Sequence, residues 1–283
     1  MVNPGHHQIL VMGARGSVGS HVLAELIARG VPVRASARRP QPGQFPDGVD
    51  VCAADLTDPA SLASALDGVE RVFLYANHQG VRGVVDTARA AGVQRIVLMS
   101  SGSVVRPTSR GNAITEAHRD VEEAFASATD LTVIPIRPLV LASNALFWAG
   151  QIRAAGAVAI YQPDALTAPI HERDIAAVAV AALTGNDDTT DLLTGPARLS
   201  QRDQVAAIAA ATGRFITVNA LTRRDAFIRF SRFMPAEEAE AVLLVLDDAA
   251  AGNSPATDSL ERILGRPAIP FDVWAVEHAA DFG

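Results

Sequence analysis

Three evenly spaced glycines near the amino terminus are the clearest chemical signal in the sequence. Gly13, Gly16 and Gly19 follow an apolar run, residues 9–12, and the apolar residues beyond them recur at helical intervals. Glycines at the junction of a strand and a helix permit a sharp turn and let the backbone approach a phosphate group. Unpaired N–H groups at the start of the helix then bind the phosphate oxygens. The stretch predicts a dinucleotide-binding turn formed by Gly13, Arg15, Gly16, Ser17, Val18 and Gly19.

Arginines occupy the position at which dinucleotide-binding folds recognise the ribose of the cofactor. An enzyme that prefers NAD places an acidic residue about 20 positions beyond the glycines, where it binds the 2′-hydroxyl. Here Arg38 and Arg39 stand in that zone, and Arg15 lies inside the glycine turn. Guanidinium groups match the geometry and charge of a phosphate dianion. We therefore predict NADP(H) as the cofactor; the alternative is three solvated surface arginines.

Two further segments complete the predicted cofactor site. Asp55 and Leu56 follow the third predicted strand, where such folds approach the adenine, although Asp55 could equally be an ordinary turn residue. Ala76 and Asn77 follow the fourth predicted strand and are expected near the nicotinamide. His78 comes next, and we assign it to the substrate side of the same region.

Apolar strands and amphipathic helices alternate through the first half of the chain and must position these residues. The predicted strands are 9–12, 31–37, 49–53, 71–75, 94–99 and 131–136, and the predicted helices include 59–66, 81–91 and 114–128. This alternation is typical of an α/β fold, a Rossmann-type doubly wound parallel sheet. Ligands of such sheets bind at the carboxyl ends of the strands.

The pattern changes after residue 138, and we expect a smaller C-terminal substrate lobe there. Short strands at 157–161, 167–170, 191–193 and 215–220 alternate with helices at 174–183 and 199–212, the latter capped by Ser200. We predict an NADP-binding domain over 1–138, its sheet completed by parts of 165–195, and a substrate lobe over 139–164 and 196–283. The aromatic residues that either line a substrate pocket or form plain core are Phe147, Trp148, Tyr161, Phe227 and Phe230.

Composition narrows the class of protein. The chain has 283 residues and a net charge of −7, which weighs against nucleic acid as a partner. No apolar run is long enough for a bilayer, and the first residues show no signal pattern, so we expect a cytoplasmic protein. We also predict a monomer or a homodimer. All 24 basic residues are arginine, which excludes lysine chemistry. Cys52, the single cysteine, falls in what we predict as a buried strand, and no residue cluster has metal-ligand spacing.

Several segments resemble the NmrA-like group of atypical short-chain dehydrogenases. The resemblance rests on GARGSVG, AADLTD, RIVLMSSGSV, VIPIRP, TAPIHERDIAAVA, LTGPARLSQRDQVAAIAAATGR and GRPAIPFDVWAVEHAADF, and it covers nearly the whole chain. It implies a Rossmann fold, NADP(H), and the reduction of small hydrophobic or aromatic acceptors such as quinones, ketones or conjugated alkenes. The group also includes NADP-sensing regulators without turnover.

The sequence departs from the wider superfamily where its catalytic Tyr-x-x-x-Lys pair would stand. Ile114 matches the tyrosine and His118 matches the lysine, so the usual proton donor is missing. Ser101 matches the serine that orients the carbonyl, or it caps a turn, and Thr115 is the nearest hydroxyl to the missing tyrosine. His118 could hold the ribose, act as an acid, or lie on the helix surface.

We expect the remaining polar candidates to have structural roles, and more than one function remains possible for the protein. We expect Glu122, on the same helix face as His118, to be an ion-pair partner and His171 to be structural. The preferred function is an NADPH-dependent reductase of a quinone or of an aryl or polycyclic ketone. The alternatives are a non-enzymatic NADP(H) sensor, and an isomerase or dehydratase on the same fold.

Overall fold

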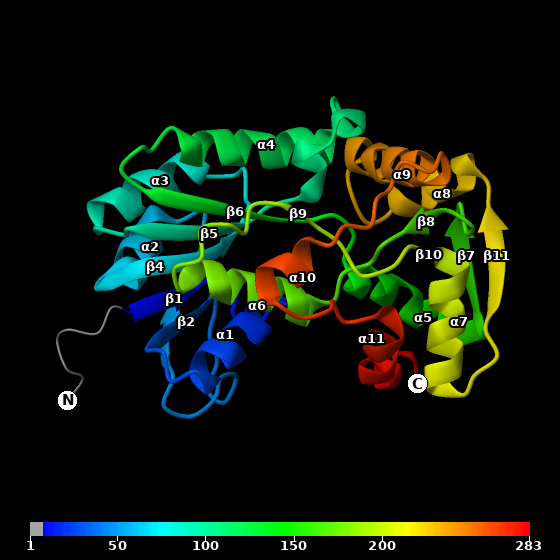
Figure 1. The fold of residues 1–283 in the computed structure, drawn as a ribbon, viewed down its shortest axis with the longest axis horizontal. Coiled ribbons are helices and arrows are strands. Elements are labelled where there is room, and N and C mark those ends of the chain that lie inside the picture. The colour runs from blue at the N-terminus through cyan, green and yellow to red at the C-terminus, as the bar shows by residue number, and fades with distance from the viewer. Residues whose placement is uncertain (1–7) are drawn as a thin grey trace. The chain divides into compact units, whose positions relative to one another are not determined.

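Seven strands form the main sheet of the computed structural model, which describes residues 8–283 (Figure 1). The strand order is β3-β2-β1-β4-β5-β6-β9, and neighbouring strands from β3 to β6 pair in parallel. Their bounds are β1 Gln8–Val11, β2 Val33–Ala37, β3 Asp50–Ala53, β4 Val69–Tyr75, β5 Arg95–Met99, β6 Thr132–Pro138 and β9 Leu192–Leu193. The predicted doubly wound parallel sheet is thereby confirmed.

The chain divides into two compact units, each built from several segments. The first unit comprises the residues up to Gly102 together with Ala117–Arg137 and Ile175–Asp191. The second comprises Ser103–Glu116, Pro138–Asp174 and Leu192–Gly283. The division of cofactor and substrate binding between two domains stays a prediction.

Helices cover both faces of the sheet. They are α1 Gly19–Ala28, α2 Pro59–Leu66, α3 Val81–Ala90, α4 Ala113–Ala126 and α6 Glu172–Leu183. Figure 1 shows α3 and α4 above the strands and α1 and α6 below them. Because both faces are buried, consecutive residues of β1 and β5 are apolar rather than alternating.

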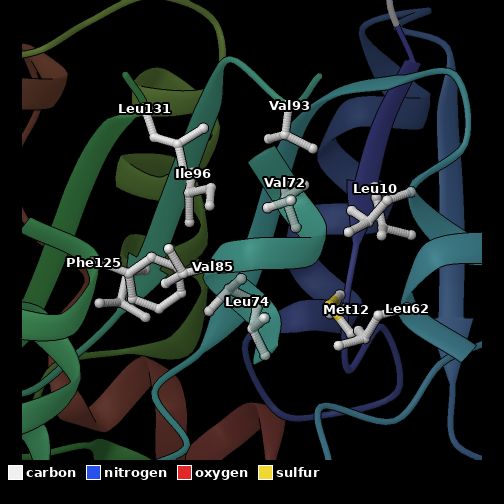
Figure 2. Packing of buried hydrophobic residues seen from close by; sticks show 14 of the residues in the cluster. Leu10, Met12, Leu62, Val72, Leu74, Val85, Val93, Ile96, Phe125 and Leu131 are labelled. Carbon is white, nitrogen blue, oxygen red and sulfur yellow. The ribbon is translucent and has the colours of Figure 1, made fainter. Parts of the chain in front are cut away.

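One face of the sheet packs against α2, α3 and α4 in a continuous apolar cluster (Figure 2). Leu10, Val72 and Ile96 of neighbouring strands face Leu62 of α2 and Phe125 of α4. Each fully buried apolar side chain of this size contributes about 1.5–3 kcal/mol of transfer free energy. The cluster holds the carboxyl ends of β1 and β4 in a fixed relation, and the glycine turn begins there.

The edge strand β3 corrects one expectation. Cys52 is half-buried rather than enclosed, because β3 has a neighbour on one side only and most of its residues are exposed. Partial burial raises the pKa of the Cys52 thiol. Arg34 on β2 connects the edge strand to its neighbours. Its Nε lies 2.7 Å from Asp50 Oδ2 on β3, and its Nη1 donates hydrogen bonds to the carbonyl oxygens of Ala65 and Asp67.

The second unit contains short helices and two small sheets. Its strands are β7 Ala157–Tyr161, β8 Leu166–Thr167, β10 Leu199–Ser200 and β11 Thr217–Leu221, in which β7 pairs with β11 in parallel and β8 pairs with β10 antiparallel. Its helices are α5 Ala149–Ala155, α7 Gln201–Thr212, α8 Arg223–Phe230, α9 Ala236–Ala250, α10 Ser259–Leu264 and α11 Phe271–Glu277. Its 3₁₀ turns are η1 Gly102–Val105, η2 Pro107–Ser109, η3 Ala142–Trp148 and η4 Ala279–Phe282.

The C-terminal residues supply the core of this unit. Trp274 is fully buried, stacks on Phe271 with ring centroids 5.0 Å apart, and meets Phe282 edge-on. The predicted cap of α7 is confirmed, because Ser200 and Asp203 form a reciprocal capping box. Pro235 is the N-cap of α9, a position that suits proline because the helix has not yet begun there.

Within residues 8–283, no helix combines the length and the apolar composition needed to cross a bilayer. The first seven residues, where we found no signal pattern, lie outside the described residues.

Candidate functional site

The glycine turn connects β1 to α1 in a conformation that two of its three glycines make possible. Gly13 adopts a φ of +63°, a region that side chains disfavour. A Cβ atom at Gly19 would lie 2.3 Å from the carbonyl oxygen of Gly13, so no other residue fits there without a backbone shift. Gly16 does not adopt a positive φ, and its constraint is space rather than backbone conformation.

A cavity of about 920 Å³ opens at this turn, at the carboxyl ends of β1 to β4. Ligands of doubly wound sheets bind at this edge. The cavity lies entirely within the first unit. Of the predicted cofactor residues, it is lined by Gly13, Arg15, Gly16, Arg38, Arg39, Asp55, Leu56 and Asn77.

Three exposed arginines border the cavity without an ion-pair partner among residues 8–283. Arg15 extends from the glycine turn, and Arg38 and Arg39 follow β2. Other arginines of the first unit are engaged: Arg95, for example, lies 2.6 Å from Asp187. Three cations without a partner around one cavity are suited to a ligand that carries phosphate groups.

Ser36 supplies an independent indication that the cavity accepts a polar ligand. Its side chain is fully buried at the end of β2 and lines the cavity. The hydroxyl has no hydrogen-bond partner within the described part of the chain. A buried hydroxyl without a partner costs about 1–3 kcal/mol, so a ligand that supplied one would recover that free energy. The cradle of glycines, the arginines and this hydroxyl together fit a phosphate-bearing dinucleotide.

Asp55 is a structured turn residue that still faces the cavity. Its Oδ1 accepts hydrogen bonds from the backbone N–H and the hydroxyl of Thr57, at 2.9 and 2.8 Å. These hydrogen bonds, with a smaller contribution from the charge of Arg38, hold the pKa of Asp55 below its usual range. Both interpretations offered for this residue are therefore compatible with its position.

Tyr75, like Ser36, is a residue of the cavity that the sequence analysis did not identify. From the sequence we assigned Tyr75 no part in the site, yet Tyr75 lines the cavity, and its hydroxyl accepts a hydrogen bond of 2.9 Å from the N–H of Gly19. The ring packs edge-on against Phe73, with centroids 5.4 Å apart, and burial raises the pKa of the phenol. The pairing of β1 with β4 was the available signal: Val11 lies opposite Phe73, which places Tyr75 beside Gly13.

The other predicted cofactor residues lie in or next to the same elements. Val18 is the fully buried N-cap of α1, and Ser17 before it is exposed. Ala76 donates its N–H to the carbonyl oxygen of Met99 at 2.9 Å. Asn77 Oδ1 accepts the N–H of Gln79 at 3.0 Å, and His78 between them is exposed.

The catalytic candidates come from different units of the structure. Ser101, which follows β5, and His118 on α4 are half-buried residues of the first unit. Thr115 belongs to the second unit, is 1% exposed, and directs its hydroxyl to Asn112 Oδ1 at 3.4 Å. Asn112 also accepts the backbone N–H groups of residues 114 and 115, so Thr115 lies in a helix cap. The catalytic parts of the three residues remain predictions.

Two polar residues take the structural parts expected of them. Glu122 pairs with Arg137, with 2.5 Å between Nη2 and Oε2. His171 is buried, and its Nδ1 accepts the N–H of Arg173 at 3.1 Å. Within residues 8–283, no group of three or more His, Cys, Asp or Glu side chains is arranged to hold a metal ion.

The aromatic residues assigned to the substrate all lie in the second unit. Phe147 is 79% exposed, whereas Trp148, Phe227 and Phe230 are half-buried. Tyr161 donates its hydroxyl to Asp247 Oδ1 at 2.6 Å, and burial together with that carboxylate raises the pKa of the phenol. Their assignment to a substrate pocket stays a prediction.

Known proteins resemble this chain in both sequence and fold. The model of a family described as NAD(P)H-binding matches residues 13–186. A (4-alkanoyl-5-oxo-2,5-dihydrofuran-3-yl)methyl phosphate reductase of Streptomyces griseus is 36% identical, over 97% of this chain and 99% of its own. An NAD(P)H azoreductase of Xenophilus azovorans is 32% identical over 97% and 99%. An NADPH-dependent quinone oxidoreductase of Escherichia coli, solved with NADPH, aligns with a TM-score of 0.77 at 23% identity, over 95% and 99% of the two chains.

Proposed function

Because the chain belongs to the NAD(P)H-binding family, we propose that it is an NADPH-dependent reductase of a small conjugated acceptor, a quinone or an aryl or polycyclic ketone. The observation that carries the proposal is the cavity at the glycine turn with its three arginines and the unpartnered hydroxyl of Ser36. Such a lining suits NADP(H) better than NAD(H), since only the former carries the additional 2′-phosphate.

The residues of the first unit would divide the cofactor between them. Backbone N–H groups at the start of α1 would hold the pyrophosphate, and Arg38 with Arg39 and Arg15 would hold the 2′-phosphate. Ser36 and Asp55 also line the cavity, and we assign them to the adenosine. The bound cofactor supplies hydride chemistry, and the protein supplies orientation.

The acceptor class follows from the missing proton donor. Ile114 and His118 stand where the wider superfamily has tyrosine and lysine, so no phenol is positioned there to protonate a developing alkoxide. A quinone or a polycyclic ketone delocalises the charge it gains and needs less help from a general acid. Ser101 would orient the carbonyl, and His118 would hold the nicotinamide ribose. The relatives named as azoreductase and quinone oxidoreductase support an acceptor of this electronic type.

A second candidate is a non-enzymatic NADP(H)-sensing protein, and one observation favours it. The same two positions, Ile114 and His118, lack the groups that turnover requires in the wider superfamily. In this case NADPH binds and no acceptor is reduced. An isomerase or dehydratase that retains its cofactor would likewise show no net oxidation of NADPH.

A screen of NADPH oxidation tests the proposal. The purified chain is incubated with NADPH or NADH and a panel of quinones, aryl ketones and azo compounds. We expect acceptor-dependent oxidation of NADPH that exceeds oxidation of NADH. Binding of NADPH without oxidation by any acceptor would refute the reductase and favour the sensor, or an isomerase or dehydratase that retains its cofactor. The expectations of a cytoplasmic monomer or homodimer, without nucleic-acid partners, are tested separately by fractionation and light scattering.

A further inference from the structure

The hydroxyl of Tyr75 stands where the glycine turn would otherwise receive a ligand. Its oxygen accepts the N–H of Gly19, at the start of α1, at 2.9 Å, and it also interacts with the N–H of Val18. Unpaired N–H groups at this end of a helix are the donors that a dinucleotide-binding turn offers to a pyrophosphate. Tyr75 therefore uses donor capacity on which the proposed cofactor would depend.

The ring of Tyr75 fills the space that the glycines leave. A Cβ atom at Gly13 would lie 2.8 Å from Tyr75 Cε2, and one at Gly16 would lie 2.9 Å from its hydroxyl oxygen. The absence of side chains at these two positions accommodates the tyrosine in the structure described here. Phe73 packs edge-on against the Tyr75 ring, with 5.4 Å between the ring centroids.

We propose that the Tyr75 hydroxyl and the cofactor compete for the N–H groups at the start of α1, so that the hydroxyl leaves the Gly19 N–H when the cofactor binds. The proposal rests on the NADP(H) site inferred above, whose unpartnered Ser36 and arginines lie in the same cavity. Tyrosine is protonated at neutral pH, and burial raises the pKa of this phenol further. As a neutral acceptor it satisfies the helix terminus more weakly than a phosphate would, so the exchange is reversible.

Loss of the Tyr75 hydroxyl should raise the affinity for NADP⁺ and lower the stability of the protein measured without cofactor. Tyr75→Phe keeps the ring and removes the internal acceptor, so NADP⁺ no longer competes with the hydroxyl. A neutral hydrogen bond of this kind corresponds to roughly 2- to 10-fold in affinity, and we expect tighter binding of NADP⁺ by that factor. Tyr75→Leu, which also removes the ring from Gly13 and Gly16, should bind at least as tightly. Both variants should be less stable than the wild type without cofactor.

Fluorine NMR tests the movement directly, without any acceptor or turnover. The chain has two tyrosines, so incorporation of meta-fluorotyrosine gives two resonances, and Tyr161→Phe identifies the signal of Tyr75. NADP⁺ is titrated into the labelled protein, and its dissociation constants for the wild type and both Tyr75 variants are measured by calorimetry. We expect the Tyr75 resonance to shift with the same midpoint as the calorimetric binding curve.

Two results would overturn the proposal. If NADP⁺ bound while the Tyr75 resonance stayed in place, the side chain would not move. If Tyr75→Phe bound NADP⁺ more weakly than the wild type, the hydroxyl would be a ligand of the cofactor rather than its competitor. Failure of every acceptor to be reduced would refute the reductase and leave this inference intact, whereas absence of NADP⁺ binding by all three proteins would refute both.

Discussion

Arg137 and Glu122 form a two-point ion pair within the first unit. Arg137 Nη2 lies 2.5 Å from Glu122 Oε2, and Arg137 Nε donates to Oε1 at 3.0 Å. Ser100 also donates its hydroxyl to Oε1, at 2.6 Å. The carboxylate of Glu122 is thus fully engaged one helical turn beyond His118, and it joins the ends of β5 and β6 to α4 rather than acting as a base.

Removal of this carboxylate should destabilise the fold. Glu122→Ala leaves a largely buried guanidinium, 18% exposed, without its partner, and we expect the free energy of unfolding to fall by about 2–3 kcal/mol. Urea denaturation measures the change. Asp130→Ala is the control, because the Arg89–Asp130 pair is about half exposed and, screened by solvent, should contribute little to stability. Equal losses in the two variants would contradict the structural part assigned to Glu122.

The closest backbone approach in the glycine turn gives a second stability prediction. Gly19→Ala places a Cβ atom 2.3 Å from the carbonyl oxygen of Gly13, and relief of that overlap should cost about 1–3 kcal/mol of unfolding free energy. Gly150→Ala is the matched control, since Gly150 lies in α5 and its Cβ would meet nothing within 4 Å. We expect Gly150→Ala to be neutral or stabilising by about 0.5–1 kcal/mol. A Gly19→Ala variant as stable as wild type would mean the turn is wider than described.

His171 predicts a pH dependence of stability. Burial lowers the pKa of the His171 imidazole below the model-peptide value of 6.5, and the positive charge of Arg173 lowers it further. The carboxylates of Glu172, Glu277 and Asp174 raise the pKa, but the net shift is downward. Below pH 6.5 the unfolded chain therefore binds a proton that the native state does not. Stability from this group is complete above pH 6.5 and falls as the pH decreases toward the native pKa, by at most about 1.4 kcal/mol per pH unit.

The variant His171→Asn isolates this contribution. An asparagine oxygen can still accept the N–H of Arg173, now bound by His171 Nδ1 at 3.1 Å, but it does not titrate. Unfolding free energies of both proteins are compared from pH 7.5 to pH 5. The wild type should lose stability relative to the variant as the pH falls. A constant difference would show that the native state takes up the proton without cost.

His118 is expected to orient the cofactor rather than to donate a proton. A positioned general acid contributes typically 10²- to 10⁴-fold to the rate. His118→Ala should lower kcat by less than about 10³-fold and act mainly through the KM for NADPH, and Ser101→Ala should likewise have a moderate effect. Steady-state kinetics on the acceptor found by the screen provide the measurement. A larger loss of kcat with NADPH affinity intact would make His118 the general acid.

Patterns within single elements were predictable, and contacts between distant elements were not. The apolar run before Gly13 and the period of α1 follow from local spacing, so the glycine turn could be found from the sequence alone. Ser200 revealed its cap because its partner, Asp203, lies three residues away. Tyr75 could not be placed in the same way. Its hydrogen bond to Gly19 spans 56 positions and depends on the register of β4 against β1.

The exposure of Cys52 and the partner of Glu122 could not be predicted either, because both depend on how the strands are arranged in the sheet. Cys52 looked buried because its strand is locally apolar, yet β3 lies at the edge, and strand order is not visible in a local pattern. The partner of Glu122 was unknown until β6 placed Arg137 beside α4. The short helices α10 and α11 carry few periodic residues and were not predicted.

The most direct test of the account compares NADPH with NADH in wild type and in Arg38→Ala, using kcat/KM at a fixed quinone concentration. A charge-assisted contact to the 2′-phosphate corresponds to roughly 1.5–3 kcal/mol, so Arg38→Ala should lower kcat/KM for NADPH by roughly 10- to 150-fold. The value for NADH should barely change, because NADH has no group for Arg38 to bind. Equal values for the two cofactors in the wild type would contradict the account, as would an Arg38→Ala variant that used both as the wild type does.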